Sequence, residues 1–258
     1  MDPFRTHGAI SWPEMQAPDQ RAAARFYAEV FGWELEEANM QDEPYFLGKV
    51  GGIPHAGMMK RVSDEIPPVW MFYVTVDDVD AVVSRVTELG GQIIAPAMTV
   101  PTVGRFCGFS DPAGAMIMAM AWESQGPDID FNQSFVTPGK FSWFELRTPD
   151  VDAALSFYAE LFGWEVEVNQ MGQGPYHILK LGDTAFGGAI PPFADGIPAH
   201  WSAYLTVADA DATAQAIAAA GGTVHMGPFE IETVGRALAF SDPQGAMLMA
   251  IQYHPPSE

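Results

Sequence analysis

The sequence predicts an α+β protein made of four tandem βαβββ modules. One observation is a repeat: the octapeptide FYAEVFGW at 26–33 returns as FYAELFGW at 157–164, 131 residues later in a chain of 258. Another is that the helix-period segment holding each octapeptide is flanked by short strand-like segments. The third is that the order of strand, helix and three strands restarts within each half.

The 131-residue offset holds over nearly the whole chain, which indicates duplication of one half without net insertion. Further landmarks that keep this offset are Gly90-Gly91 with Gly221-Gly222, TVGR at 102 and 233, and FSDPAGAMIMA at 109 with FSDPQGAMLMA at 240. We expect a first domain at 1–123, a polar linker at 124–138 and a second domain at 139–258.

The first half begins with a predicted strand at 8–15 and a helix after Asp19. Asp19 is a favourable N-cap residue, apolar residues follow at helical spacing, and Gly32 stands where a helix usually ends. The second half repeats this pattern between Asp150 and Gly163. We therefore interpret the octapeptide as the apolar face and the stop of one helix, and not as a catalytic motif.

Three further strands complete the first module, and a second module follows it. Those strands are expected at 33–38, 44–50 and 51–60, with a Gly-Gly hairpin signal before the last one. The second module is expected as a strand at 70–76, a helix within 77–91, and strands at 92–100, 105–110 and 115–122. An Asp-Pro-Ala-Gly turn joins its last two strands.

Charge and cysteine content exclude several functions. The chain carries 33 acidic and 12 basic residues, a formal charge of -21. Such a surface repels nucleic acid and anionic membranes, and it favours solubility or cationic ligands. Cys107 is the only cysteine, so an intramolecular disulfide and thiolate metal clusters are excluded. Without a signal-peptide pattern or a membrane-spanning apolar stretch, we expect a cytoplasmic protein.

The order of these landmarks resembles that of the vicinal oxygen chelate superfamily, which contains glyoxalases, bleomycin-resistance proteins and extradiol dioxygenases. The resemblance is carried in both halves by the Asp-capped FY…FGW helix, VDD or VAD before the second helix, GG after it, and SDPxG before the last strand. The chain most resembles the two-domain family that includes the mycobacterial 27 kDa culture-filtrate antigen. The resemblance implies paired modules whose curled mixed sheets surround a pocket.

The resemblance also implies where a metal would bind in metal-dependent members. Aligned on the landmarks, those positions hold Trp12, Gly57, Met71 and Met118 in the first half, and Trp143, Gly188, Ser202 and Met249 in the second. An indole does not coordinate the divalent ions of this family, and a thioether is too soft to favour them over water. We therefore expect a pocket without the family metal, and no cofactor.

Two alternative metal sites are weighed against this expectation. A divalent ion held by His200 and Glu145 would lie in the second half alone, because Val69 replaces the histidine in the first half. Alternating methionines around Met118 and Met249 could suggest Cu(I). Methionines on one strand face more often line a core or a pocket.

Glu14 and Glu145 are the candidate catalytic residues. Each lies two positions after a tryptophan, Trp12 or Trp143, and therefore on the same strand face. A carboxylate beside an indole on a pocket-facing strand would be desolvated, which raises its pKa and suits it to general-base work or to holding a cation. The alternative is an ordinary exposed or salt-bridged strand glutamate.

The candidate ligand-binding residues would supply apolar walls for a planar or cationic guest. They are Trp12, Trp143, Trp70, Trp201, Tyr73, Tyr204, Met118 and Met249. Ordinary core packing is the alternative for these side chains. Arg105 and Arg236 are candidates for binding an anionic ligand group, and the alternative for them is an ion pair with a nearby acid.

The sequence therefore favours a metal-independent protein that binds a small organic molecule, as bleomycin-resistance proteins do. The alternative is a glyoxalase-, lyase- or isomerase-type enzyme that uses Glu14, Glu145 or nonstandard metal ligands. A third class, a surface antigen or protein-interaction module, follows only from the family resemblance. We expect a small-molecule partner, no nucleic-acid or membrane partner, and either a monomer or a homodimer.

Overall fold

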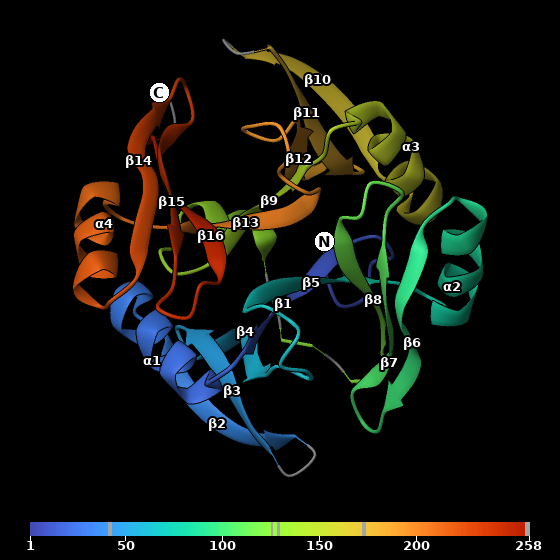
Figure 1. Ribbon diagram of the computed structural model, residues 1–258, viewed down its shortest axis with the longest axis horizontal. Coiled ribbons are helices and arrows are strands. Elements are labelled where there is room, and N and C mark those ends of the chain that lie inside the picture. The colour runs from blue at the N-terminus through green and yellow to red at the C-terminus, as the bar shows by residue number, and fades with distance from the viewer. Residues whose placement is uncertain (41–42, 125, 128–129, 172–173, 256–258) are drawn as a thin grey trace. The chain divides into compact units, whose positions relative to one another are not determined.

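The computed structural model describes residues 1–40, 43–124, 126–127, 130–171 and 174–255 (Figure 1). The elements of the first half are β1 (Ile10–Ala17), α1 (Gln20–Phe31), β2 (Glu34–Met40), β3 (Glu43–Val50), β4 (Ile53–Lys60), β5 (Val69–Thr75), α2 (Val79–Glu88), β6 (Gln92–Val100), β7 (Gly104–Ser110) and β8 (Met116–Trp122). Those of the second half are β9 (Phe141–Arg147), α3 (Val151–Phe162), β10 (Glu165–Met171), β11 (Gly174–Leu181), β12 (Thr184–Ile190), β13 (His200–Thr206), α4 (Ala210–Ala219), β14 (Thr223–Ile231), β15 (Gly235–Ser241) and β16 (Met247–Tyr253). The predicted order of four βαβββ modules is confirmed.

The strands form two mixed sheets of eight strands each. The strand order is β2-β3-β4-β1-β5-β8-β7-β6 in one sheet and β10-β11-β12-β9-β13-β16-β15-β14 in the other. Consecutive strands such as β2, β3 and β4 pair antiparallel, whereas β1 pairs in parallel with β4 and β5 with β8. The parallel pairing of the first and last strands of a module places residues of β1 directly beside residues of β4.

The octapeptide forms the last turns of α1 and of α3 and the glycine that ends each helix, as predicted, and both helices have the expected ends. The side chain of Asp19 accepts a hydrogen bond from Ala22 N at 2.9 Å, and Gly32 ends α1 with a left-handed φ of 73°. Asp150 and Gly163 do the same for α3. No helix in the described ranges has both the length and the apolar character needed to cross a membrane.

The repeated SDPxG motif forms the predicted turn between the last two strands of a module. Asp111 Oδ1 accepts hydrogen bonds from Ala113 N and Ala115 N, both at 2.9 Å. Asp242 Oδ1 makes the equivalent bonds in the second half, including one from Ala246 N at 3.0 Å. These bonds satisfy backbone donors inside the turn, so the aspartate of this motif has a structural role.

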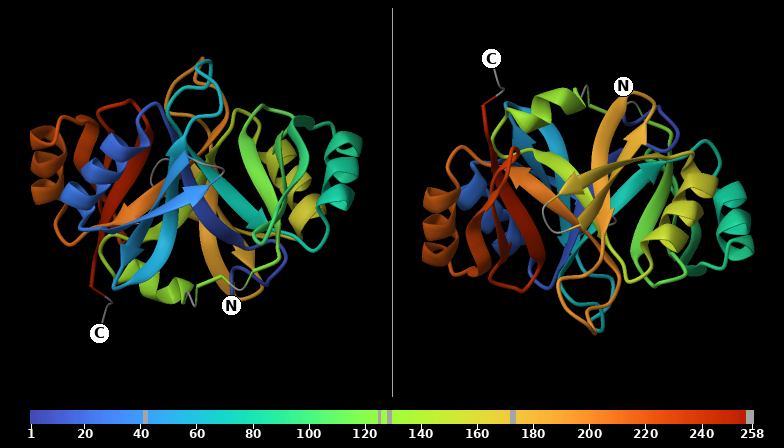
Figure 2. Two further views of the ribbon diagram at one scale, coloured as in Figure 1. Left: turned by 90° about the horizontal axis from the view of Figure 1, so that it is seen from below. Right: turned by 90° about the horizontal axis from the view of Figure 1, so that it is seen from above.

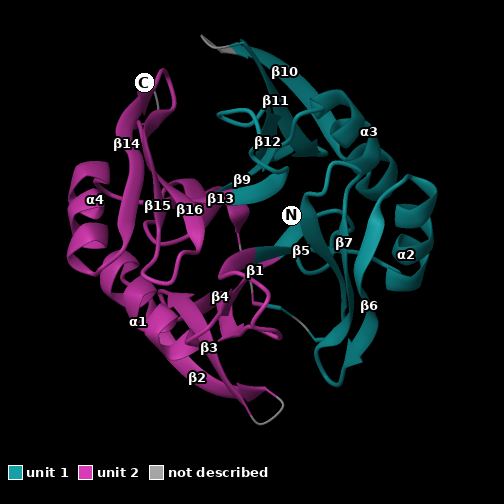
Figure 3. Ribbon diagram, viewed as in Figure 1, with its two compact units in different colours: residues 1–11, 71–126, 143–202 teal, residues 12–70, 127–142, 203–258 magenta. Residues whose placement is uncertain are grey.

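The chain divides into two compact units, and each draws on both halves of the sequence (Figure 3). Unit 1 comprises residues 1–11, 71–126 and 143–202, and unit 2 comprises residues 12–70, 127–142 and 203–258. In unit 1, α2 lies beside α3, and Arg85 Nη2 is 2.6 Å from Glu160 Oε2. In unit 2, α1 lies beside α4; both views in Figure 2 show these helix pairs.

The expected linker at 124–138 holds a short 3-10 helix, η1 (Phe131–Phe135). The side chain of Asp130 caps this helix by accepting a hydrogen bond from Asn132 N at 3.0 Å. Positions 125, 128 and 129 of the expected linker lie outside the described residues.

Candidate functional site

In unit 2, three side chains form a hydrogen-bonded group that we call the first centre: Trp12, Glu14 and Tyr45. The alternation of β1 places Trp12 and Glu14 on one strand face, and β3 supplies Tyr45. Tyr45 Oη donates to Glu14 Oε2 at 2.8 Å, and Trp12 Nε1 donates to Tyr45 Oη at 3.1 Å. Glu14 is 6% exposed, so its carboxylate is held by the protein with little access to water.

The phenol of Tyr45 stays protonated, which keeps it a hydrogen-bond donor. Burial raises its pKa well above the ordinary value, and the negative charge of Glu14 raises that pKa further. A neutral phenol that donates to a carboxylate stabilises the charged form of the carboxylate without cancelling its charge. The first centre therefore holds the Glu14 carboxyl group against a neutral phenol and beside an indole ring.

Gly57 makes room for this arrangement. In the register of β1 and β4, Glu14 lies opposite Gly57. A Cβ added at Gly57 would lie 1.8 Å from Tyr45 Oη and 3.0 Å from Trp12 Nε1. The missing side chain is therefore what allows the tyrosine hydroxyl to reach the glutamate.

Gly57→Ala is accordingly expected to lower the free energy of unfolding by about 1–3 kcal/mol, because the new methyl group overpacks the first centre. Urea unfolding measures this loss. Adding Tyr45→Phe removes the contact at 1.8 Å and leaves the ring carbon at 2.5 Å, so the double variant should regain part of the loss. A Gly57→Ala protein as stable as the wild type would contradict this description of the first centre.

Unit 1 holds the equivalent second centre, which comprises Trp143, Glu145 and Tyr176 together with Arg147. Trp143 Nε1 donates to Tyr176 Oη at 2.7 Å, and Tyr176 Oη donates to Glu145 Oε2 at 3.1 Å. Arg147 Nη2 donates to Glu145 Oε1 at 2.5 Å, and both side chains of this ion pair are about 95% buried, at 5% and 4% exposure. Gly188 repeats the role of Gly57, with Tyr176 Oη 2.2 Å from an added Cβ.

These residues do not fit the divalent metal of the superfamily that the sequence resembles. The fourth-strand position holds Gly57 or Gly188, and the tyrosine hydroxyl fills the space that a ligand side chain would need. Within the described ranges, no group of three or more His, Cys, Asp or Glu side chains is placed to hold a metal. For the alternative pair, His200 Nδ1 lies 2.9 Å from Pro198 O, and Glu145 is bonded by Arg147.

Trp70 and Trp201, which were predicted to bind ligand, lie in the aromatic core beside α1 and α3. Trp70 is 4% exposed, and its Nε1 donates to Tyr27 Oη at 2.8 Å. Trp201 is 7% exposed, and its Nε1 donates to Tyr158 Oη at 2.9 Å. Both indoles are therefore buried and hydrogen-bonded to a tyrosine of the neighbouring helix.

Tyr73, Tyr204, Met118 and Met249 are also buried, at 5–8% exposure. Tyr73 lies opposite Met118 on the parallel strands β5 and β8 of unit 1. Tyr204 lies opposite Met249 on β13 and β16 of unit 2. The structure therefore brings these predicted ligand-binding residues together in two tyrosine–methionine pairs.

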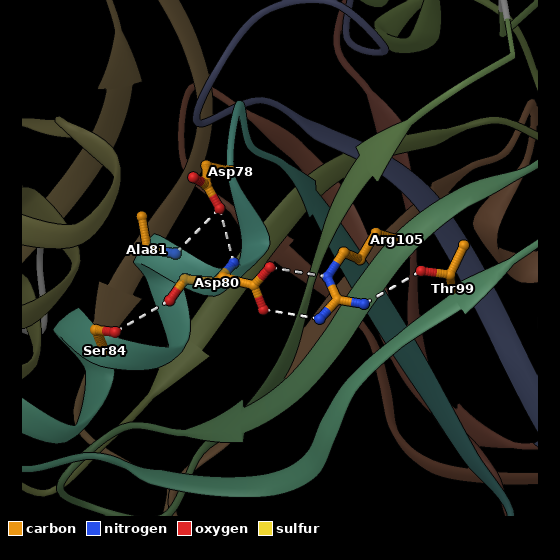
Figure 4. Close-up of polar contacts among 6 residues, drawn as sticks. All are labelled: Asp78, Asp80, Ala81, Ser84, Thr99 and Arg105. Atoms are coloured by element: carbon orange, nitrogen blue, oxygen red, sulfur yellow. Dashed lines mark hydrogen bonds and ion pairs between the residues drawn. The ribbon is translucent and has the colours of Figure 1, made fainter.

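Arg105 and Arg236 each pair with an acid at the start of a helix. Figure 4 shows Arg105 bound to Asp80 of α2 through two bonds, Nε–Oδ2 at 3.1 Å and Nη2–Oδ1 at 2.7 Å. Arg236 Nη2 donates to Asp211 Oδ1 of α4 at 2.9 Å. These are the ion pairs that were weighed as the alternative to binding an anionic ligand.

Sequence reasoning missed three residues of the two centres: Tyr45, Tyr176 and Arg147. The tyrosines were visible as a repeated Pro-Tyr pair at 44–45 and 175–176, but only the strand register shows that their hydroxyls reach the glutamates. Arg147 was visible two positions after Glu145, on the same strand face. The first half has Gln16 at that position, so the repeat gave no signal for an arginine.

Comparison with known proteins gives consistent matches over most of the chain. The family model described as the glyoxalase/bleomycin resistance protein/dioxygenase superfamily matches residues 9–119 and 140–250. The protein named "Putative glyoxylase CFP32" from Mycobacterium bovis is 36% identical over 255 residues, which cover 96% of both chains. "Anthracycline biosynthesis protein DnrV" from Streptomyces peucetius is 28% identical over 267 residues, covering 95% of this chain and 93% of the relative.

Solved structures match along the same length. The Mn(II)-bound glyoxalase from Novosphingobium aromaticivorans has a TM-score of 0.64 at 18% identity, covering 96% of this chain and 82% of that one. The 2,3-dioxygenase LapB from Pseudomonas sp. KL28 has a TM-score of 0.65 at 15% identity, covering 97% and 95%. At these identities the likeness shows the fold alone.

Proposed function

The chain belongs to the glyoxalase/bleomycin resistance protein/dioxygenase superfamily, and from this membership we propose that it binds a small organic molecule without the divalent metal of that superfamily. The observation that carries the proposal is the Trp–Tyr–Glu group, which occurs once in each unit. In each group the tyrosine hydroxyl lies where a side chain at the fourth-strand glycine would stand, beside an indole and a buried carboxyl group, and in the second centre Arg147 pairs with that carboxyl group.

An indole beside a fixed carboxylate suits a planar guest. Stacking on the ring contributes apolar contact area, and the carboxylate accepts a hydrogen bond or balances a positive charge. The relatives named as a glyoxylase and an anthracycline biosynthesis protein fit an assignment to small-molecule chemistry.

The experiment is a titration of two planar probes, quinoline and N-methylquinolinium, near pH 8, in the presence of EDTA and followed by tryptophan fluorescence. We expect saturable quenching by at least one probe. In the double variant Trp12→Leu/Trp143→Leu, both affinities should fall roughly tenfold or more, because the stacking surface is lost. Trp122→Phe, which lies outside both centres, is the matched control. Failure of both probes to bind the wild type, or equal binding to the double variant, would contradict the proposal.

A second candidate is an enzyme of glyoxalase type, and the burial of Glu14 beside Tyr45 favours it. A desolvated carboxylate with a positioned phenol can take a proton from a carbon next to a carbonyl group. Turnover of the methylglyoxal–glutathione hemithioacetal by the wild type, Glu14→Gln and Glu145→Gln tests this candidate. Activity that neither substitution reduces would exclude the carboxylate as the base.

A further inference from the structure

The loop between β12 and β13, residues 191–199, carries an aromatic side chain against the second centre. Phe193 of this loop is 53% exposed. A single exposed apolar side chain needs no explanation by itself. The Phe193 ring differs because it lies against a buried group: Arg147 Cζ is 3.4 Å from the ring centroid, and the Arg147 side chain is only 5% exposed. One face of the ring is therefore covered by the guanidinium, while much of the ring remains open to water.

Arg147 holds this loop at two points. Its Nη1 donates to Pro191 O at 3.4 Å, and its guanidinium lies over the Phe193 ring. The guanidinium is itself held by Glu145, since Arg147 Nη2 donates to Glu145 Oε1 at 2.5 Å. The alternation of β9 places Glu145 and Arg147 on the same strand face as Trp143. The Phe193 ring is therefore attached to the row of side chains that forms the second centre.

The equivalent loop of the first half, residues 61–68, is held in another way and contains no aromatic residue. Position 193 corresponds to Val62, and position 147 corresponds to Gln16. The loop has its own arginine, Arg61, which bonds within the loop: Nη1 donates to Ile66 O at 3.0 Å, and Nη2 donates to Asp64 Oδ1 at 2.8 Å. The strand arginine and the ring that it supports are therefore a paired difference between the two repeats.

A ring that is already held in place is a good surface for stacking. A ligand that binds a loosely held side chain must restrict the rotamers of that side chain, and this cost lowers the affinity. The guanidinium of Arg147 restricts the Phe193 ring before any ligand arrives. Aromatic rings stack on one another with a large apolar contact area. The open part of the Phe193 ring therefore suits a planar apolar group.

We propose that Phe193 is a ligand-binding residue of the second centre and that its ring stacks on a planar aromatic group of the bound molecule. Arg147 is a positioning residue, which acts by holding that ring. This inference rests on the proposed function and adds a specificity-determining residue to it. The second half offers a planar ligand a phenyl surface that the first half, with Val62 at this position, lacks.

The test follows the second centre by itself, in a Trp12→Leu parent that lacks the stacking surface of the first centre. Binding of quinoline, or of N-methylquinolinium if only that probe binds the wild type, is measured by calorimetry near pH 8. Phe193→Leu should weaken this binding by about threefold to tenfold, because a stacking surface is lost while an apolar side chain remains. Phe193→Tyr keeps a ring and should bind as the parent does. Val62→Ala, at the same loop position of the first half, is the matched control that should change nothing.

Arg147→Lys tests the positioning role. Lysine keeps a positive charge beside Glu145 but has no planar group to support the Phe193 ring. In the Trp12→Leu parent, probe affinity should fall by about twofold to fivefold. Because the arginine acts through the ring, adding Arg147→Lys to Phe193→Leu should cause no further loss. A purely structural role of the arginine would instead lower the affinity of both proteins.

Equal probe affinity of Phe193→Leu and its parent would overturn the inference, and so would a loss that Phe193→Tyr shares. A Trp12→Leu protein that binds no probe although the wild type does would also overturn it, because the second centre would then take no planar ligand. Since Phe193 is exposed, leucine there should leave the midpoint of urea unfolding unchanged, which separates a loss of affinity from a loss of structure. If neither probe binds the wild type, the proposed function itself fails, and this result is distinct from the others.

Discussion

Replacing Arg147 with methionine is expected to lower the free energy of unfolding by about 3–5 kcal/mol, because Glu145 would stay buried without its cation. The ion pair that would be lost has an Nη2–Oε1 distance of 2.5 Å, and its side chains are 5% and 4% exposed. The substitution also removes the stacking of the guanidinium on Phe193.

Urea unfolding measures this loss, and the repeat supplies the control. Gln16→Met makes the same replacement at the equivalent position of β1, where no ion pair is broken, and should change stability by less than about 1 kcal/mol. The double variant Glu145→Gln/Arg147→Met also removes the buried charge of Glu145, so it should recover much of the lost free energy of unfolding. Equal stability of Arg147→Met and Gln16→Met would show that the buried pair does not act as described.

The stability of the protein is expected to fall on acidification through His55, by about 2 kcal/mol between neutral pH and pH 5. Burial lowers the pKa of His55 from 6.5 to about 4. The unfolded chain therefore binds a proton near pH 6.5, while the folded protein keeps this imidazole neutral. As the pH falls, proton binding lowers the free energy of the unfolded state relative to the folded state. The contribution of His55 is complete above pH 6.5 and is lost progressively toward pH 4.

His55→Phe isolates this effect, because the second half already has Phe186 at the equivalent position. The Phe186 ring packs 4.9 Å from Trp164, much as the His55 ring packs 4.8 Å from Trp33. Urea unfolding of both proteins at pH 7 and pH 5 should show a smaller acid loss in the variant. Burial raises the pKa values of Asp111 and Asp242, so these groups increase stability on acidification. They do so equally in the wild type and in His55→Phe. Parallel stability curves would contradict the role of His55.

The elements of the fold were predictable because their signals are local. The octapeptide carries its own N-cap aspartate and its stop at Gly32, and the turn motif carries the aspartate that satisfies the turn. The structure adds what Tyr27 of the octapeptide does: it accepts the indole hydrogen of Trp70 in the core. That contact joins residues 43 positions apart and has no local signature.

Only part of the candidate site could be predicted, because some of its residues have local signals and others meet only through contacts between distant parts of the sequence. Glu14 and Glu145 were identified from strand alternation next to a tryptophan, and both are buried in the structure. Tyr45 reaches Glu14 across 31 residues of sequence, and this depends on the register of three strands and on the missing side chain at Gly57. A glycine in a strand signals a close approach without showing which group approaches.

The division into compact units could not be predicted from the repeat. A constant offset shows that the two halves are copies of one another. It does not indicate which modules pack together, because every possible pairing of modules has the same offset. In the structure α1 lies beside α4 and α2 beside α3, so each unit combines modules from different halves. The contacts between these helices, such as Arg85 with Glu160, join residues without a shared sequence pattern.

The metal content of the purified chain tests the central claim most directly. The protein would be incubated with excess Mn²⁺ or Zn²⁺, passed through gel filtration, and analysed by inductively coupled plasma mass spectrometry. The tyrosine hydroxyls lie where side chains at Gly57 and Gly188 would stand, and the part of the chain that the structure describes holds no group of three or more His, Cys, Asp or Glu placed to bind a metal. We therefore predict far less than one retained ion per half, with quinoline or N-methylquinolinium binding intact. About one tightly held ion in each half, with probe binding lost on its removal, would contradict the account.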